Sequence, residues 1–138
     1  MGVKIGLEGK LYRGTAGSTA GTEITNAKDV ALKLNMSEAD HARRGDAGWD
    51  STSVATIGAE LTFGMVYDSA DASFVALKNA ALNRTPLAFA NLDGTGGKGM
   101  DADFVITGFG RDEPLKAGMT VPVTCKNNND IRVPVWPD

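Results

Sequence analysis

The 138-residue sequence predicts a mainly β (α+β) fold, an antiparallel β-sandwich or barrel with one flanking α-helix. Most apolar segments alternate with polar residues at a period of two, which is typical of half-buried strands. One segment, at about residues 70–83, changes to helical spacing. Because strands come before and after it and no internal repeat appears, we expect one domain spanning residues 1–138.

The first strands are expected on either side of a flexible turn. Residues 3–7 (VKIGL) alternate in hydrophobicity, and the following KLYR extends or pairs with them. Residues 14–22 contain only small and hydroxyl residues, so they have little to bury and favour a turn. Residues 28–36 predict a half-buried strand, because Val30, Leu32, Leu34 and Met36 share one face.

A second pair of strands precedes the helix. STSVATI is the weaker candidate, AELTFGMVY has a clean period of two, and Gly58 between them is the expected turn. In the helix at about 70–83, Ser69 or Asp71 can cap the exposed amides, and Pro86 favours an end just before it. The apolar residues that recur there at helical spacing are Phe74, Leu77, Ala81 and Leu82.

The C-terminal half predicts three more segments. PLAFANL and ADFVITGFG are strands joined by a glycine turn, and the second is expected to be central because both its faces are apolar. MTVPVTC follows, where Pro122 favours an edge position or an outward-facing amide. Residues at about 127–138 carry two prolines and, near the end, Trp136, so we expect a C-terminal arm; an extended segment lying on something else is one alternative.

Composition excludes some classes of partner. The net charge of −3 disfavours a basic grip on nucleic acid. The single cysteine, Cys125, excludes an internal disulfide and is interpreted as a small buried hydrophobe. The N-terminus lacks the apolar core of a signal peptide, and no apolar run is long enough to span a membrane, so we expect a protein made and soluble in the cytoplasm.

No set of residues predicts catalysis, a cofactor or a metal. DGTGGKGM differs from a phosphate-binding loop in its glycine spacing and in the residue after Lys98, so a hairpin turn is expected. His41 is the only histidine and is interpreted as a solvated loop residue. Asp101 with Asp103, and Asp68 with Asp71, are paired carboxylates for which structural roles are favoured over acid–base or calcium chemistry. The Arg44-Gly45-Asp46 tripeptide is too short to indicate receptor adhesion.

The overall layout resembles the tail tube proteins of long-tailed bacteriophages over nearly the whole chain. The segments that carry the resemblance are KIGLEGKLYRGT, EADHARRGDAGW, AELTFGMVYDSADASFVALKNA and ADFVITGFGRDEPLKAGMTVPVTCK. The resemblance implies a β-sandwich or barrel with one helix, whose copies form hexameric rings that stack into a tube. It also implies that the loop matching Glu38–Asp50 reaches neighbouring subunits. The ending RVPVWPD maps onto no shared motif.

A long charged loop, residues 37–51, has its own physical interpretation. A connection of this length inside a compact domain is either functional or disordered. Arg43 and Arg44, with Asp46 beside them, can form charge-assisted bonds with the next subunit, and Trp49 offers an apolar anchor. The alternative is that Trp49 folds back over its own sheet. We place Trp136 with these four residues as the expected subunit interface.

The sequence therefore predicts a structural virion protein of a phage tail tube, without enzymatic activity. Its partners would be further copies of itself, other tail proteins and genome DNA in transient, non-specific passage. It would reside in the virion tail after synthesis in the host cytoplasm. Two alternatives stay open: a ring-forming tube protein of a contractile phage or secretion system, and a small β-barrel that binds an apolar ligand. Core positions are expected at Leu61, Phe63, Phe104 and Ile106, with Phe74 and Leu77 seating the helix.

Overall fold

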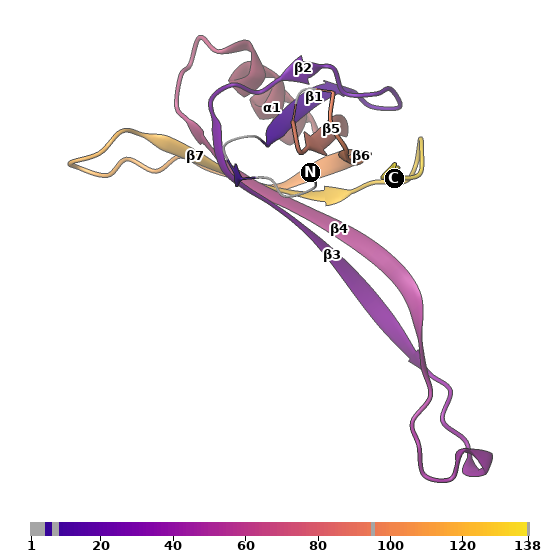
Figure 1. Ribbon diagram of the computed structural model, residues 1–138. Helices are drawn as coiled ribbons and strands as arrows, with labels where there is room; N and C mark the ends of the chain where they lie inside the picture. Colours follow the sequence, from indigo (N-terminus) through magenta and orange to yellow (C-terminus); the bar gives the residue numbers. More distant parts are fainter. Residues whose placement is uncertain (1–4, 7–8, 95, 138) are drawn as a thin grey trace.

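The computed structural model describes residues 5–6, 9–94 and 96–137, without the side chain of Asp46. Figure 1 shows a body of strands and one helix, from which a long hairpin projects. The elements are β1 (Lys10–Thr15), β2 (Thr22–Glu23), β3 (Ala27–Asp40), the short 3-10 helix η2 (Arg44–Asp46), β4 (Thr52–Val66), α1 (Ala72–Asn83), β5 (Leu87–Leu92), β6 (Gly99–Phe109) and β7 (Thr120–Asn127).

The strands form one sheet in the order β2-β1-β5-β6-β7-β4-β3, and every pairing is antiparallel. The predicted fold class, a mainly β antiparallel fold with one helix, is confirmed. β6 occupies the middle of the sheet, as its two apolar faces predict. β2 and β3 form the two ends of the sheet, so each has only one neighbouring strand in the described structure.

The sheet curls around a core of phenylalanines. β4 and β5 are separated by two strands, which would place them roughly 14 Å apart in a flat sheet. Yet the rings of Phe63 in β4 and Phe89 in β5 have centroids only 6.1 Å apart. Phe104 of β6 completes this cluster at 5.9 Å from Phe89. Leu61, Phe63 and Phe104 are buried as predicted, whereas Ile106 is only partly buried.

Helix α1 begins where the capping pattern predicts. The Asp71 carboxylate accepts a hydrogen bond from the Phe74 amide at 3.0 Å, which satisfies one of the free N–H groups of the first turn. Arg84 ends the helix in a left-handed conformation, with φ of 59°. Phe74 and Leu77 are buried against the body, but Leu82 is exposed although it shares the helical spacing.

Several strand predictions need correction. The segment 28–36 belongs to β3 but is not half-buried, because β3 is an end strand whose outer half leaves the body. Gly58 is no turn, since β4 continues through it. Pro122 lies in β7, an inner strand rather than an edge, and its carbonyl accepts from Gly110 just beyond the end of β6. The predicted strand at 3–7 lies largely outside the described residues, and neither Ile5 nor Gly6 is in a strand.

Cys125 offers a direct test of the packing of β7. The thiol is fully buried, and this burial raises its pKa to about 12. Only about one molecule in ten thousand would carry the reactive thiolate at pH 8. We expect dithiobis(nitrobenzoate) to release no nitrothiobenzoate from the native protein within an hour at pH 8, and one equivalent after unfolding in guanidinium chloride. Rapid reaction of the native protein would contradict this packing.

Candidate functional site

The hairpin of β3 and β4 leaves the body and projects into solvent (Figure 1). β7 pairs with β4 only as far as Glu60, opposite Lys126. One step further, the side chain of Asn127 accepts the Ala59 amide at 2.9 Å and so ends the ladder. Beyond that point β3 and β4 pair only with each other in the described structure. We call residues 34–59 the arm.

Strand β3 replaces only the first four residues of the predicted loop at 37–51. β3 continues to Asp40 and β4 begins at Thr52, so the connection itself covers only residues 41–51. The loop prediction was wrong at its start because residues 37–40 form strand. These residues are polar and solvated on an exposed ribbon, and a polar sequence carries little signal for a strand without a core face.

One face of the arm is apolar and uncovered. Leu34 lies opposite Ala59 and Met36 opposite Ile57, so these four side chains share a face. Val54 pairs with Glu38 on the same side. We call Leu34, Met36, Val54 and Ile57 the apolar stripe; they are 40–58% exposed. The opposite face carries polar residues, including Lys33, Asn35 and Ser37.

The apolar stripe continues the core face of β4. Because side chains alternate along a strand, Ile57 lies on the same face as Leu61, Phe63 and Met65, which are buried in the body. Completing the burial of the four stripe residues would stabilise an assembly by roughly 4 kcal/mol, taking about 1 kcal/mol for each half-exposed side chain. The arm is therefore a surface that another protein surface can stabilise.

The tip of the arm gathers three predicted interface residues. Arg43, Arg44 and Trp49 all lie in the connection at 41–51, where Ala47 and Gly48 turn the chain with positive φ values. Trp49 is 79% exposed, so it does not fold back over its own sheet. His41 is exposed and hydrogen-bonds to Ser53. Asp46 lies in η2, but its side chain is outside the described part of the structure.

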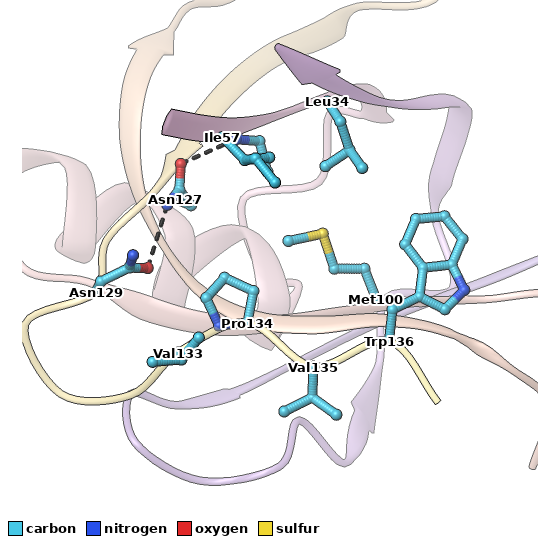
Figure 2. Close-up of a pocket in the computed structure, with 10 residues that line it drawn as sticks. Leu34, Ile57, Met100, Asn127, Asn129, Val133, Pro134, Val135 and Trp136 are labelled. Carbon is cyan, nitrogen blue, oxygen red and sulfur yellow. Dashed lines mark hydrogen bonds between the residues drawn. The ribbon is translucent and has the colours of Figure 1, made fainter. Parts of the chain in front are cut away.

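Trp136 lies elsewhere, in an apolar groove at the root of the arm (Figure 2). The groove has a volume of about 290 Å³. Leu34 and Ile57 of the apolar stripe form one wall, while Met100, Pro134 and Trp136 lie across from them in Figure 2. The structure therefore divides the predicted interface between the tip of the arm and this groove. The sequence gives no simple indication that the C-terminal segment forms a wall of this groove.

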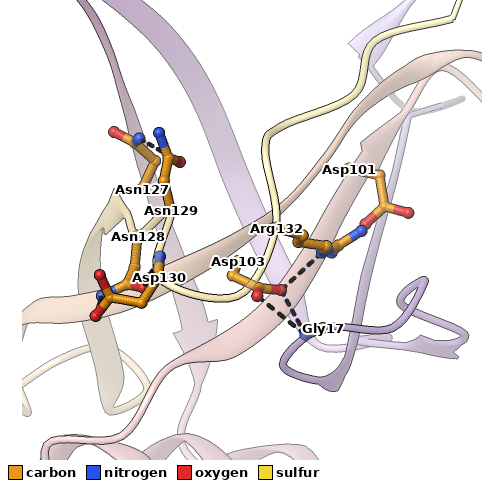
Figure 3. Close-up of polar contacts among 8 residues, drawn as sticks. All are labelled: Gly17, Asp101, Asp103, Asn127, Asn128, Asn129, Asp130 and Arg132. Carbon is orange, nitrogen blue, oxygen red and sulfur yellow. Dashed lines mark hydrogen bonds and ion pairs between the residues drawn. The ribbon is translucent and has the colours of Figure 1, made fainter.

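The C-terminal segment 128–137 is held against its own body by a partly buried ion pair (Figure 3). Val135 and Asp101 exchange backbone hydrogen bonds of 2.8 and 2.9 Å, beside the part of β6 that β7 does not reach. Arg132 donates to Asp103 and to Asp101, each at 2.8 Å. Asp103 is 1% exposed and also accepts the Gly17 amide. We call these contacts the Arg132 clasp.

The clasp gives the paired carboxylates the structural role that the sequence favours. Burial lowers the pKa of Arg132, but the hydrogen bonds and charges of Asp101 and Asp103 outweigh that effect and raise it. The guanidinium therefore stays charged, and the buried charge of Asp103 has a partner. Asp68 and Asp71 likewise cap local backbone amides, those of Ala70 and Phe74.

Other features have structural roles in the described part of the chain. The glycine turn between β5 and β6 closes a hairpin. The Asp93 amide donates a hydrogen bond to the Lys98 carbonyl, and the Lys98 amide donates one to the Asp93 carboxylate. Within residues 5–6, 9–94 and 96–137, no three His, Cys, Asp or Glu side chains come together as metal ligands. None of the helices in these ranges is long and apolar enough to cross a membrane.

Comparisons with known proteins identify the fold. Neither a scan against protein-family models nor a search of curated proteins finds a match. Among solved structures, a chain in the C6-symmetric tail of an empty gene transfer agent particle has a TM-score of 0.81 at 13% identity, covering 99% of this chain and 100% of that one. A chain in the native gene transfer agent virion scores 0.77 at 10% identity, covering 99% and 100%.

The third similar structure is the SPP1 tail tube. Its TM-score is 0.70 at 9% identity, and the match covers 94% of this chain and 82% of that one. The match thus extends over nearly the whole chain, including the arm and the body. The fold is tail-tube-like.

The Arg132 clasp generates a stability prediction. Arg132→Met leaves the buried carboxylate of Asp103 without its cationic partner, so we expect the free energy of unfolding to fall by about 3 kcal/mol. Arg111→Met is the matched control, because its ion pair with Glu113 is exposed, so the loss of stability should be much smaller than for Arg132→Met. Guanidinium denaturation of both variants at pH 7 measures the difference. Equal, small losses would contradict the assigned role.

Proposed function

We propose that this chain is the structural subunit of a phage-type tail tube, whose copies form hexameric rings that stack into a conduit for genome DNA. Similarity over nearly the whole of this chain, to a chain in a tail with C6 symmetry and to a tail tube, supports the proposal. The role is architectural and involves no catalysis and no cofactor. The proposed location is the virion tail, after synthesis in the host cytoplasm.

The observation that carries the proposal is the uncovered apolar stripe on a projecting arm. A single subunit covers only the root end of the stripe, at the groove, because the arm extends away from its own body (Figure 1). In a closed ring, every subunit lays its arm on a neighbour and receives an arm in return, so all stripes are buried without leaving a free end. A two-fold dimer would also bury the stripes, and the similarity to a chain in a C6-symmetric tail favours the ring over the dimer.

The ends of the sheet are consistent with side-by-side neighbours. β3 is a 14-residue end strand, so its outer backbone groups lack a strand partner among the described residues. Such an edge invites uncontrolled pairing unless another surface covers it. In the proposed ring the adjacent copy covers this edge.

The predicted interface residues take separate places in this assembly. Arg43, Arg44 and Asp46 would make charge-assisted contacts at the tip of the arm, and Trp49 would supply its apolar anchor. Trp136, on the wall of the groove, would contact a neighbouring copy near the root of the arm. Other tail proteins would meet the same surfaces at the two ends of the tube.

The proposed conduit requires DNA to pass without binding tightly. The chain carries a net charge of −3, so the assembled tube would repel phosphates rather than retain them. Passage would then be transient and independent of sequence.

A charge on the apolar stripe tests the ring interface. Ile57→Asp places a carboxylate in the surface that the proposal buries, so we expect the concentration needed for ring or tube formation to rise at least tenfold. Asn35→Asp on the opposite, polar face of the arm is the control and should assemble more readily than Ile57→Asp. Light scattering and negative-stain images measure both, with circular dichroism to verify folding. Equal assembly of the two variants would contradict burial of the stripe.

Removal of the tip anchor tests the role of Trp49. We expect Trp49→Ala to weaken assembly by about 2 kcal/mol, or roughly thirtyfold in concentration, while the monomer keeps its thermal stability. Leu82→Ala removes an exposed apolar side chain from α1 and serves as the comparison. Analytical ultracentrifugation over a concentration series reports the change. Normal tubes from Trp49→Ala would refute the assignment of this residue.

A further inference from the structure

A second pocket lies on the body, between α1 and the end of β6. We infer that it receives Trp49 and Asp50 from the arm tip of a second copy. This inference rests on the proposed assembly and names the surface that accepts the arm.

The pocket has aromatic walls. It has a volume of about 520 Å³ and is lined in part by Tyr67, Phe74 and Phe109. Tyr67 meets Phe74 edge-on with ring centroids 5.2 Å apart, and Phe109 lies 6.0 Å from Phe74. An indole can pack against such rings in the offset or edge-to-face arrangements that aromatic pairs prefer.

The pocket also carries two cations. Arg111 lies over the Tyr67 ring at 5.2 Å and is already engaged with the Tyr67 hydroxyl and with Glu113, each at 3.4 Å. Lys78 projects from α1 into the same pocket lining and has no ion-pair partner in the part of the chain that the structure describes. The pocket therefore offers one available ammonium group beside an aromatic surface.

The tip of the arm has the complementary chemistry. Trp49 is strongly exposed, and the adjacent Asp50 is exposed without an ion pair to any described residue. An indole followed by a carboxylate matches aromatic walls next to Lys78. The groove at the root of the arm fits this pair less well, because its lining contains no charged side chain and would leave the Asp50 carboxylate unpaired.

Only another copy can supply the tip. β4 runs seven residues from Ala59 to Thr52, which carries the tip roughly 23 Å beyond the end of the β7 ladder. Figure 1 shows the tip at the far end of the arm, away from α1. A molecule therefore cannot fill its own pocket, whereas a neighbour in a ring or in the next ring can.

Charge exchange tests the contact between Lys78 and Asp50. Lys78→Glu and Asp50→Lys should each raise the concentration for half-maximal ring or tube formation at least tenfold. The double variant restores the opposite charges and should return this concentration to within about threefold of the unmodified protein. Lys98→Glu makes the same charge change in the exposed β5–β6 turn and should leave assembly unchanged.

The outcomes separate the two proposals. If the unmodified chain forms rings, but the single variants assemble normally or the double variant shows no recovery, the docking site is wrong and the tube function stands. If the unmodified chain forms no ring at any concentration, both proposals fail.

Disulfide trapping gives an independent readout. Cys125 is buried, so thiols introduced at the surface react without competition from it. In assembled protein, the Asp50→Cys/Lys78→Cys double variant should give a ladder of linked chains on non-reducing gels after mild copper-phenanthroline oxidation. The Asp50→Cys/Lys98→Cys variant is the matched control and should remain unlinked. Equal linking in both variants, or none in the first, would overturn the docking site.

Discussion

The structure depends on one constraint: the apolar face of β4 is longer than the body that can cover it. Met65, Phe63 and Leu61 use this face to build the core, and the same alternation continues to Ile57 after β7 has ended at the arm root. The hydrophobic effect acts on both parts alike, since it depends on the area removed from water and not on which chain removes it. The strand that organises the core of the body thus also exposes an apolar surface that a partner could cover.

The root of the arm is held from several directions. Asn127 terminates the β7 ladder on β4, and the Arg132 clasp fixes the C-terminal segment that forms the far wall of the groove. A buried ion pair gains little net stability, because removing both charges from water costs about as much as their attraction returns. Its value here is positional: it fixes Val135 and Trp136 relative to Leu34 and Ile57. In the proposed assembly, an arm that must reach a neighbouring copy in a defined orientation needs a rigid base.

Sequence reasoning succeeded for the elements that pack against the core, because burial gives their residues a recognisable hydrophobic pattern. The Asp71 cap and the Phe74–Leu77 spacing located α1, and two apolar faces placed β6 at the centre. Sequence reasoning failed at residues 37–40 of the arm, because strand residues that face no core show no hydrophobic alternation. It also failed at Gly58, because the backbone hydrogen bonds that keep this residue in a strand depend on the partner strand and not on the local sequence. Arg43, Arg44 and Trp49 share the arm tip because they are close in sequence, and their role in a subunit interface stays a prediction. The pocket near Lys78 was missed because its walls come from separate elements.

The arm separates two requirements of assembly. An apolar stripe supplies contact area but little discrimination, and an exposed two-stranded ribbon could bind any apolar surface or strand edge. The tip adds charged side chains and the indole of Trp49. In the proposed docking, both find partners only at a surface that has opposite charges next to aromatic side chains. In the proposed docking, a misplaced arm would desolvate Asp50 without an ammonium partner, and that penalty would oppose wrong registers. In the proposed assembly, the ionic residues at the end of the arm would therefore favour one register for a largely apolar contact.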